Sequence, residues 1–163
     1  MDGAKHIELI DAFARAYGPV KEALLDVGPE ELAFVPKEPA DAWSINDHLV
    51  HLLDADMMLW YRVRVAVAEP GTEVPVWDQD AWQRRLAYSS LGGLTCLTLA
   101  ESVRAVMATA LRALAVGDWS GYWLQHPERG RMGLEDILAL YRDHAGVHLA
   151  YIERNLAAFH RVA

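Results

Sequence analysis

Helix-breaking residues in this chain are few and grouped, and this pattern constrains the fold more than any other feature of the sequence. The 7 prolines and 11 glycines among 163 residues gather in short segments, with long uninterrupted stretches between them. Valine, isoleucine and threonine are scattered, and they never alternate with polar residues over the length of a strand. The sequence therefore predicts an all-α protein built from a few long helices.

The predicted helices are delimited by these breaks and by capping residues. They cover about residues 6–27, 44–69, 94–116 and 134–160. The first is expected to kink or split at Gly18-Pro19, because proline lacks a backbone donor and clashes with the preceding turn. The second begins at Ser44, whose hydroxyl can cap the helix, and Asp47 completes a capping box three residues later. It ends before Pro70.

The helices are joined by connections, of which the two later ones are long. Residues 28–42 are expected to form an ordered connection that contains several prolines. Residues 71–93 are expected to be a loop with a short helical piece around Trp82, and residues 118–133 form a second loop. Long antiparallel helices around one core are the default packing for this pattern. We therefore expect an antiparallel four-helix bundle with long loops after the second and third helices, in a single domain over residues 1–163.

Composition excludes several classes of function. The chain carries 15 basic and 23 acidic side chains, a net charge of -8, which argues against a surface that binds nucleic acid. The single cysteine, Cys96, excludes an internal disulfide or a multi-cysteine zinc site. The N-terminal sequence MDGAKHIELIDAF does not resemble a secretory signal, and no uncharged apolar run reaches the roughly 20 residues of a membrane span. We expect a cytoplasmic protein with no nucleic-acid or membrane partner.

Two histidines stand on the face of the fourth helix that is expected to point inward. Positions at alternating steps of four and three form one seam along this helix: Ile137, Tyr141, His144, His148, Tyr151 and Asn155. His144 and His148 are one turn apart, so their rings lie one above the other and can share a metal ion. Two hydrogen-bonded core histidines would have the same spacing. Zinc proteases carry His-Glu-x-x-His, whereas this chain has His-Ala-Gly-Val-His, which excludes that class.

A third metal ligand could come from the second helix, which offers His48 and His51. The strongest apolar stripe of this helix passes closer to His48, but the helix is apolar on several sides, and periodicity leaves the choice open. A helix that is apolar almost all round is either wholly buried or in contact with a second subunit. A homodimer is therefore expected.

Motifs in both helices resemble those of the DinB/YfiT-like superfamily. The segment WSINDHLVHLLDAD, residues 43–56, resembles the signature of the second helix in that family. Residues 141–148 are similar to the family's Tyr-x-x-His-x-x-x-His pattern. Between them, residues 75–82 and the segment HPERG at 126–130 are similar to the YfiT branch. The resemblance covers most of the chain.

This resemblance implies a bundle, often dimeric, that holds a divalent metal ion such as zinc or nickel with histidines. Carried over by position, the ligands are His51, His144 and His148. Three histidine ligands leave an open position on the ion for water or substrate. The ion can lower the pKa of bound water toward about 7, or bind and deprotonate a thiol. Asp47 and Asp54, one turn either side of His51, are candidates to accept its second N–H, and solvated surface acids are the alternative.

The resemblance favours a metal-dependent enzyme that transfers a low-molecular-weight thiol, similar to bacillithiol, to an electrophilic small molecule. One alternative is a metal-dependent hydrolase that uses hydroxide formed at the metal. Others are a non-catalytic, metal-stabilised bundle for stress response or ligand binding, and a dimerisation module without metal. The sequence assigns no general base and no other catalytic side chain.

Further residues have both a functional and a structural interpretation. His48 is expected at the edge of the core or at an interface, and His126 is either a turn residue or a group that reaches the mouth of the site. Cys96 is expected to pack against its apolar neighbours, and His6 and His160 to carry no function. Residues near the two long loops could line a pocket or bind a substrate carboxylate: Trp77, Trp82, Trp119, Trp123, Arg84, Arg85, Arg129 and Arg131.

Overall fold

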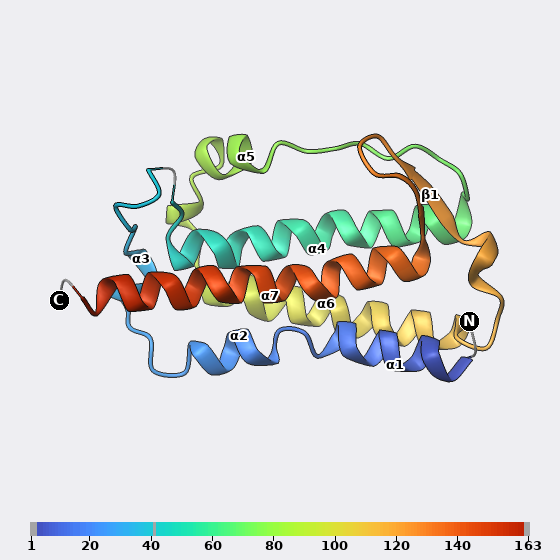
Figure 1. Cartoon of the computed structure of the whole chain (residues 1–163), viewed down its shortest axis with the longest axis horizontal. Coiled ribbons are helices and arrows are strands. Elements are labelled where there is room, and N and C mark those ends of the chain that lie inside the picture. Colours follow the sequence, from blue (N-terminus) through green and yellow to red (C-terminus); the bar gives the residue numbers. More distant parts are fainter. Residues whose placement is uncertain (1–2, 41, 162–163) are drawn as a thin grey trace.

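The computed structural model describes residues 3–40 and 42–161, so both ends of the expected domain lie outside the described residues. Its helices are α1 (Gly3–Ala14), α2 (Gly18–Ala23), α3 (Pro29–Ala33), α4 (Ile45–Ala68), α5 (Gln79–Arg85), α6 (Gly93–Leu114) and α7 (Leu134–Phe159). Two 3-10 turns, η1 (Tyr88–Ser90) and η2 (Trp119–Gly121), and two strands, β1 (Trp123–His126) and β2 (Gly130–Gly133), complete the described secondary structure. The long helices form the predicted four-helix bundle, in which α1 and α2 together make one rod (Figure 1).

Neighbouring helices of the bundle do not all run antiparallel. α4 is antiparallel to α7, and α1 to α6, as expected, whereas α4 and α6 run in the same direction (Figure 1). Near their N-termini, the Asn46 side chain accepts a hydrogen bond from the Gly93 amide, and farther along both helices Asp56 pairs with Arg104. The parallel pair is possible because residues 69–92, which include α5, return along the length of α4 before α6 begins.

The break in the first rod and the start of α4 follow from local sequence. The expected first helix is divided, and Pro19 stands in the first turn of α2, where its missing amide donor is not needed. Ser44 caps α4: its hydroxyl accepts from the Asp47 amide at 3.1 Å, and the Asp47 carboxylate accepts from the Ser44 amide at 3.2 Å. This capping box fixes where α4 begins. The connection over residues 28–42 contains α3, which the sequence does not predict.

Residues 118–133, expected to be a loop, contain a β-hairpin. β1 and β2 pair antiparallel, with His126 opposite Gly130. Gly130 adopts a φ of 71°, which the tight turn between the strands requires and which a side chain would disfavour. A parallel bridge between Glu73 and Gln125 ties the hairpin to the chain that follows α4. The hairpin and this return segment lie on the same side of the bundle, beside α4 (Figure 1).

The packing of α6 accounts for part of its apolar composition. Among residues 3–40 and 42–161, α6 alone has the length and hydropathy of a membrane-spanning helix. It packs against α1 and α4, however, and it carries Arg104, which is fully buried in an ion pair with Asp56 of α4. Apolar side chains from α6 enter two core clusters, one at each end of the bundle. One face of α6 therefore belongs to the core of the bundle, whereas Leu94, Leu99 and Val106 on its other faces are exposed.

Candidate metal centre

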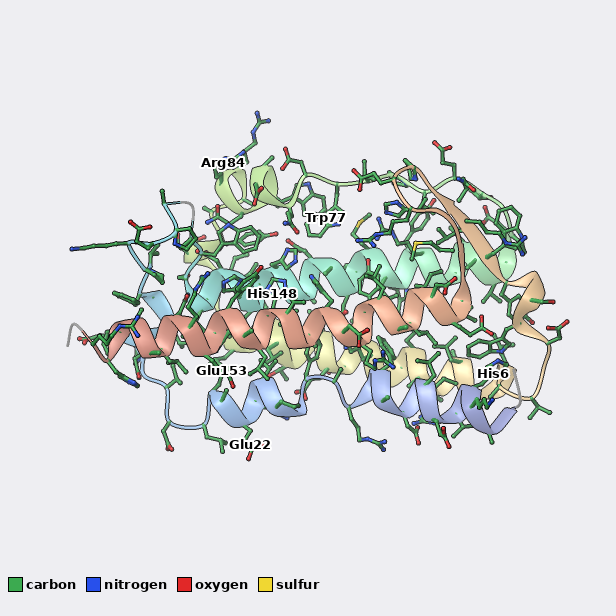
Figure 2. The ribbon with its side chains drawn as sticks, in the orientation of Figure 1. His6, Glu22, Trp77, Arg84, His148 and Glu153 are labelled. Carbon is green, nitrogen blue, oxygen red and sulfur yellow. The ribbon has the colours of Figure 1, made fainter. Side chains whose placement is uncertain are left out.

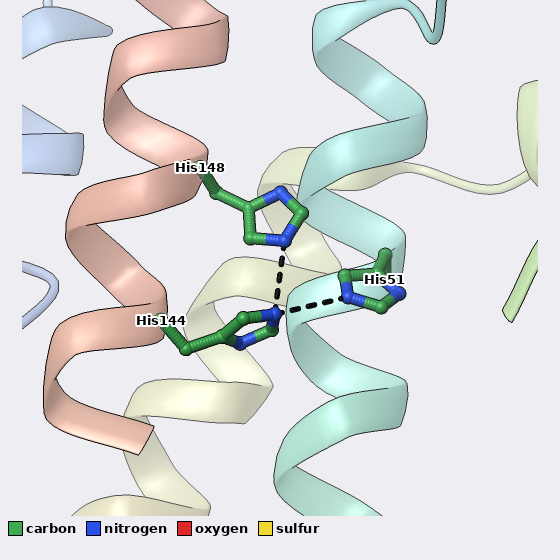
Figure 3. A group of neighbouring side chains, drawn as sticks. All are labelled: His51, His144 and His148. Carbon is green, nitrogen blue, oxygen red and sulfur yellow. Dashed lines mark hydrogen bonds between the residues drawn. The ribbon is translucent and has the colours of Figure 1, made fainter. Parts of the chain in front are cut away.

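Histidines from two helices converge inside the bundle. His51 lies in the second turn of α4, and His144 and His148 lie one turn apart on the facing side of α7 (Figure 3). The Nε2 atom of His144 is 3.3 Å from Nε2 of His51 and 3.0 Å from Nε2 of His148. Each ring offers one nitrogen to a common point, and these nitrogens lie within 4.8 Å of one another. The structure thus brings together the residues that the family resemblance selects as ligands.

The spacing of these nitrogens fits a divalent metal ion. Zinc–nitrogen bonds of about 2.0–2.1 Å at tetrahedral angles place ligand nitrogens about 3.3 Å apart. The observed separations of 3.0 and 3.3 Å are close to this value. Hydrogen bonds between the rings explain this arrangement less well than a metal ion does. Nε2 of His144 faces the Nε2 atoms of both His51 and His148, but a nitrogen of a neutral imidazole carries at most one proton to donate. The donor set is that of an open site, with imidazole nitrogens from two rigid helices.

Burial keeps these imidazoles neutral. Loss of hydration lowers the pKa of His51 to about 3, and the neighbouring His144 and His48 contribute to the shift. Loss of hydration also lowers the pKa of His144 to about 4, with Arg104 as a secondary cause. The pKa of His148 is lowered by burial first and then by the adjacent histidines. Since metal ions bind the neutral form of imidazole, all of these rings are in the state required for coordination at neutral pH.

His48 contacts the site from behind His148. The Nδ1 atoms of these two rings are 3.1 Å apart. If Nε2 of His148 bound an ion at the shared point, the proton of that ring would sit on Nδ1 and be donated to Nδ1 of His48. His48 is buried, and burial lowers its pKa to about 4, so its Nδ1 is available as an acceptor. His48, expected at the edge of the core, is therefore a partner of a candidate ligand.

The acids expected to accept from His51 lie elsewhere. Asp47 is buried and belongs to the N-terminal cap of α4. Asp54 accepts a hydrogen bond from the hydroxyl of Tyr88, and burial raises its pKa. Nδ1 of His51 has no partner among the described residues. Neither acid therefore accepts the second N–H of His51 in this structure, although Asp47 Oδ1 is also buried without a partner. Neither acid is the freely solvated surface acid of the alternative interpretation, because Asp47 is buried and Asp54 is half-buried.

Cavities on either side of His144 give access to the histidines. One, of about 450 Å³, is lined by His51 and His144 and by Trp77, whose ring stacks on that of His51 with centroids 5.3 Å apart. Figure 2 shows Trp77 between the return segment and the bundle. His126 and Arg129 of the hairpin line the same cavity. A second cavity, of about 460 Å³, is lined by residues that include Trp43, His48, Arg129, His144, His148, Tyr151 and Arg154. Both volumes suit a small molecule.

Several residues singled out by the sequence lie away from the site. Trp119 is buried and stacks on His6 with ring centroids 3.9 Å apart, so this pair fills one end of the bundle. Trp123 packs against the guanidinium of Arg131. Cys96 is half-buried, and burial raises its pKa, so it is not an activated thiol. Outside the lining of both cavities are also Trp82, Arg84, Arg85 and His160.

Arg62 is a residue of the site that sequence reasoning missed. It stands at helical spacing from Leu59 and Ala66, two buried positions of α4. Its guanidinium lines the cavity of about 450 Å³ and donates a hydrogen bond to the hydroxyl of Tyr141 at 2.8 Å. The available sequence signal is a charged residue at helical spacing between apolar positions of α4, which is uncommon at an inward position unless the charge has a partner.

The sequence profile of the DinB superfamily matches residues 12–152, a range that contains all the histidines of the candidate centre. The chain belongs to the DinB superfamily. The family inferred from the motifs at residues 43–56 and 141–148 is thereby confirmed.

Relatives of this DinB protein carry names that mark them as candidate metal-dependent hydrolases. A candidate metal-dependent hydrolase of Halalkalibacterium halodurans is 25% identical over 138 residues, which are 85% of this chain and 80% of the relative. Another, of Oceanobacillus iheyensis, is 25% identical over 133 residues, or 82% of this chain and 75% of the relative. The solved structure of YfiT from Bacillus subtilis, described as a probable metal-dependent hydrolase with an unusual four-helix bundle topology, matches with a TM-score of 0.82 at 19% identity. That match covers 95% of this chain and 87% of YfiT, and it confirms the fold.

Proposed function

We propose that this DinB protein is a metal-dependent enzyme acting on a small molecule, with His51, His144 and His148 as ligands of a divalent ion. The observation that carries the proposal is the convergence of their neutral Nε2 atoms beside a cavity of about 450 Å³. Closed structural sites surround an ion with four protein ligands. The histidine group found among the described residues supplies three, which leaves one position open. The names of the two relatives agree with a metal-dependent activity.

Each side chain of the site has a task that its contacts support. A divalent ion bound here would lower the pKa of a thiol or water molecule at its open position. The candidate ligand histidines stay neutral because loss of hydration lowers their pKa values. His48 accepts the Nδ1 proton of His148 and so orients that ring. Trp77 covers one face of His51 and shields it from bulk water.

The reaction that we propose first is thiol transfer, with a low-molecular-weight thiol such as bacillithiol as nucleophile. A bond forms from the thiol sulfur to an electrophilic carbon, the leaving group departs with its electron pair, and the thiol proton passes to solvent. The support is the family resemblance of residues 43–56, 75–82, 126–130 and 141–148, which implies thiol-dependent transferases among the relatives. Hydrolysis is the second candidate, because both relatives carry hydrolase names. A nitrogen-only donor set accepts several first-row metals, and we propose zinc or nickel.

Metal content is the first test. The protein is produced without a histidine tag, incubated with zinc or nickel, and analysed for metal after removal of the excess. We expect about one ion per chain in the wild type, a large loss in His148→Ala, and wild-type content in His160→Ala. His160 is exposed and pairs with Glu31, so this variant is a matched control. A wild type that retains no more metal than His148→Ala would contradict the proposal.

Activity is the second test. Metal-loaded protein is mixed with a bacillithiol-type thiol and monochlorobimane, and adduct fluorescence is followed. We expect turnover in the wild type and in His160→Ala, and none in His148→Ala. Ester hydrolysis without thiol tests the second candidate reaction. No turnover in either assay, combined with a large metal-dependent rise in Tm, would contradict the enzymatic proposal and support a metal-stabilised, non-catalytic bundle.

The homodimer expected from the apolar character of α4 stays a prediction. Met57 and Tyr61 of α4 are exposed in the single chain, which leaves apolar surface for a second copy. Light scattering on the purified protein measures the mass directly. A mass near twice 18.2 kDa supports the dimer, and a mass near 18.2 kDa contradicts it.

A further inference from the structure

Arg62 is a buried cation, and no acid among the described residues neutralises it. The residue is 7% exposed, and it lines the cavity beside the candidate metal centre. Nη1 donates to the Tyr141 hydroxyl at 2.8 Å, and Nη2 donates to the Pro75 carbonyl at 3.2 Å. Nε is buried and has no partner, and none of the ion pairs within residues 3–40 and 42–161 includes Arg62. Neutral acceptors do not cancel a charge removed from water, so this position favours an anion.

Arg104 shows how the same bundle neutralises a buried guanidinium. Its Nε and Nη2 atoms contact the two carboxylate oxygens of Asp56 at 2.7 and 2.9 Å. Both residues are fully buried, and their charges compensate each other. Arg62 lies farther along α4 than Asp56 and has no equivalent partner within the described residues. The difference between the two arginines is that Arg62 adjoins a cavity, where a ligand can supply the missing anion.

His126 adds a second donor at the same place. Its Nδ1 accepts the amide N–H of Glu128 at 3.2 Å, so the neutral ring carries its proton on Nε2. Nε2 lies 3.4 Å from Nη2 of Arg62. Because both nitrogens are donors, neither satisfies the other. Burial lowers the pKa of His126, and the adjacent Arg62 lowers it further, which keeps the ring neutral.

We propose that Arg62 and His126 form an anion subsite that binds a carboxylate of the small molecule handled at the candidate metal centre. The identity of the occupant as substrate rests on the proposed function. The subsite and the metal centre are adjacent, because Tyr141 accepts from Arg62 and its ring centroid is 6.1 Å from that of His144. A guanidinium and an imidazole N–H at one cavity wall offer the directed donors that a planar carboxylate accepts.

Other charged groups of the cavity are compatible with an anionic ligand. Arg129 lines it and adds a second positive charge. Asp78 and Glu128 also line it, but neither forms an ion pair with Arg62 within the described residues. The Asp78 carboxylate accepts from the Ala81 amide at the start of α5, at 2.9 Å. The negative charge of Asp78 is thus held by a helix N-terminus rather than by the buried arginine.

Binding of benzoate to protein freed of metal by a chelator tests the subsite. Isothermal titration calorimetry compares benzoate with benzamide, its neutral analogue. We expect the Kd for benzamide to be at least tenfold higher, and the Kd for benzoate to rise at least tenfold in Arg62→Gln. Arg84→Gln, on α5 outside the cavity lining, is the matched control and should keep the wild-type Kd. Equal affinities for the two compounds, or an unchanged Kd in Arg62→Gln, would overturn the proposal.

A measurement on the wild type guards against loss of folding in Arg62→Gln, since Arg62 also connects α4 to Tyr141. The arginine Nε–H resonances are followed by NMR during a benzoate titration, and the Arg62 signal is expected to shift. A titration that moves other arginine signals and leaves Arg62 unchanged would overturn the assignment. His126→Ala, in the hairpin, removes one donor without changing any residue of α4 and should also raise the Kd for benzoate.

Using metal-free protein keeps this inference separable from the proposed function. If benzoate binding depends on Arg62 but the protein has no metal-dependent activity, the anion subsite is supported and the proposed enzymatic function is contradicted. If the protein is active with equal kcat/KM for carboxylated and neutral electrophiles, the proposed enzymatic function is supported and the anion subsite is contradicted. Inorganic phosphate that binds through Arg62 where benzoate does not would overturn the assignment to a carboxylate.

Discussion

His148 meets other histidines through both of its ring nitrogens. Nε2 faces His144 at 3.0 Å, and Nδ1 faces Nδ1 of His48 at 3.1 Å. A metal-ligating imidazole is oriented by the group that accepts its second N–H, and His48 is placed to be that group. His48 stacks on Tyr151, with ring centroids 5.2 Å apart, which holds the acceptor ring in position. His48 is thus a positioning residue that acts through His148.

Replacing His48 by phenylalanine is expected to weaken metal binding while preserving the packing against Tyr151. Phenylalanine cannot accept the Nδ1 proton of His148, and loss of such a partner raises the Kd for metal about 10–100-fold. Competition with a chromophoric chelator measures the change. His48→Gln retains an acceptor and is expected to recover part of the affinity. A Kd in His48→Phe equal to that of the wild type would show that His48 does not orient His148.

Sequence spacing is sufficient to place His144 and His148 on one seam, but it cannot choose between His48 and His51. The start of α4 is buried on several sides, so both histidines are buried, and apolar periodicity does not say which ring reaches the shared point. The family motif makes that choice. Neither sequence spacing nor the family motif predicts the role proposed for Arg62. That role depends on His126, which is 64 positions away in a hairpin that the sequence does not predict.

Asp56 and Arg104 connect the rods of the bundle at its centre. Arg104 pairs with Asp56 of α4 and donates to the carbonyl of Phe13 in α1 at 3.3 Å. It also donates to the carbonyl of Tyr141 in α7 at 3.1 Å. The hydroxyl of Tyr17 donates to Asp56 at 2.9 Å. This buried group therefore sets how the parallel helices α4 and α6 are aligned.

Asp56→Ala is expected to lower the free energy of unfolding by about 3–5 kcal/mol, because it leaves the guanidinium of Arg104 buried and unpaired. Urea denaturation of the metal-free protein measures the loss. The double variant Asp56→Leu with Arg104→Met removes both charges and is expected to be more stable than Asp56→Ala. Arg112→Ala, which removes an exposed ion pair with Asp11, is the control and should have a much smaller effect. An Asp56→Ala variant as stable as this control would refute the central role of the pair.

Ser44→Ala is expected to lower the free energy of unfolding by about 1 kcal/mol, because it removes the side-chain acceptor for the Asp47 amide at the start of α4. Thermal and urea denaturation measure the change. Thr98→Ala is the matched control, since the Thr98 hydroxyl donates to a carbonyl within α6 and caps nothing. Equal stability losses in the two variants would contradict a specific capping role for Ser44.

Among the secondary-structure elements, the long helices can be predicted from the local sequence, whereas the short helices and strands cannot. The predicted limits 44–69 match α4 (Ile45–Ala68), because a capping box and Pro70 mark its ends. The strands WLQH and GRMG contain none of the β-branched residues that favour strands, and each is only 4 residues long. Their pairing depends partly on a bridge to Glu73, a long-range contact that no local pattern reveals.

For the molecule as a whole, the layer of buried histidines between α4 and α7 links stability to pH. Burial lowers the pKa of His48 and His144 to about 4 and that of His51 to about 3, from an ordinary value of 6.5. In the unfolded chain these residues regain ordinary values. Between pH 6.5 and about 4 the unfolded state therefore binds more protons than the folded state, so the free energy of unfolding must fall as the pH falls.

The metal-free protein is accordingly expected to lose at least about 2 kcal/mol of stability between pH 7 and pH 5, the amount that a single such histidine contributes over this range. Urea denaturation at several pH values measures the slope. The slope should be smaller in the double variant His144→Asn with His148→Asn, which removes two of the buried titrating groups. Asp11 and Glu31, whose pKa values are lowered by hydrogen bonds to Arg112 and to the Gly28 amide, titrate below this window in the folded state and do not produce the effect. A free energy of unfolding that stays constant from pH 7 to pH 5 would mean that the histidines are already hydrated in the folded protein, and a dry, neutral metal centre would then be excluded.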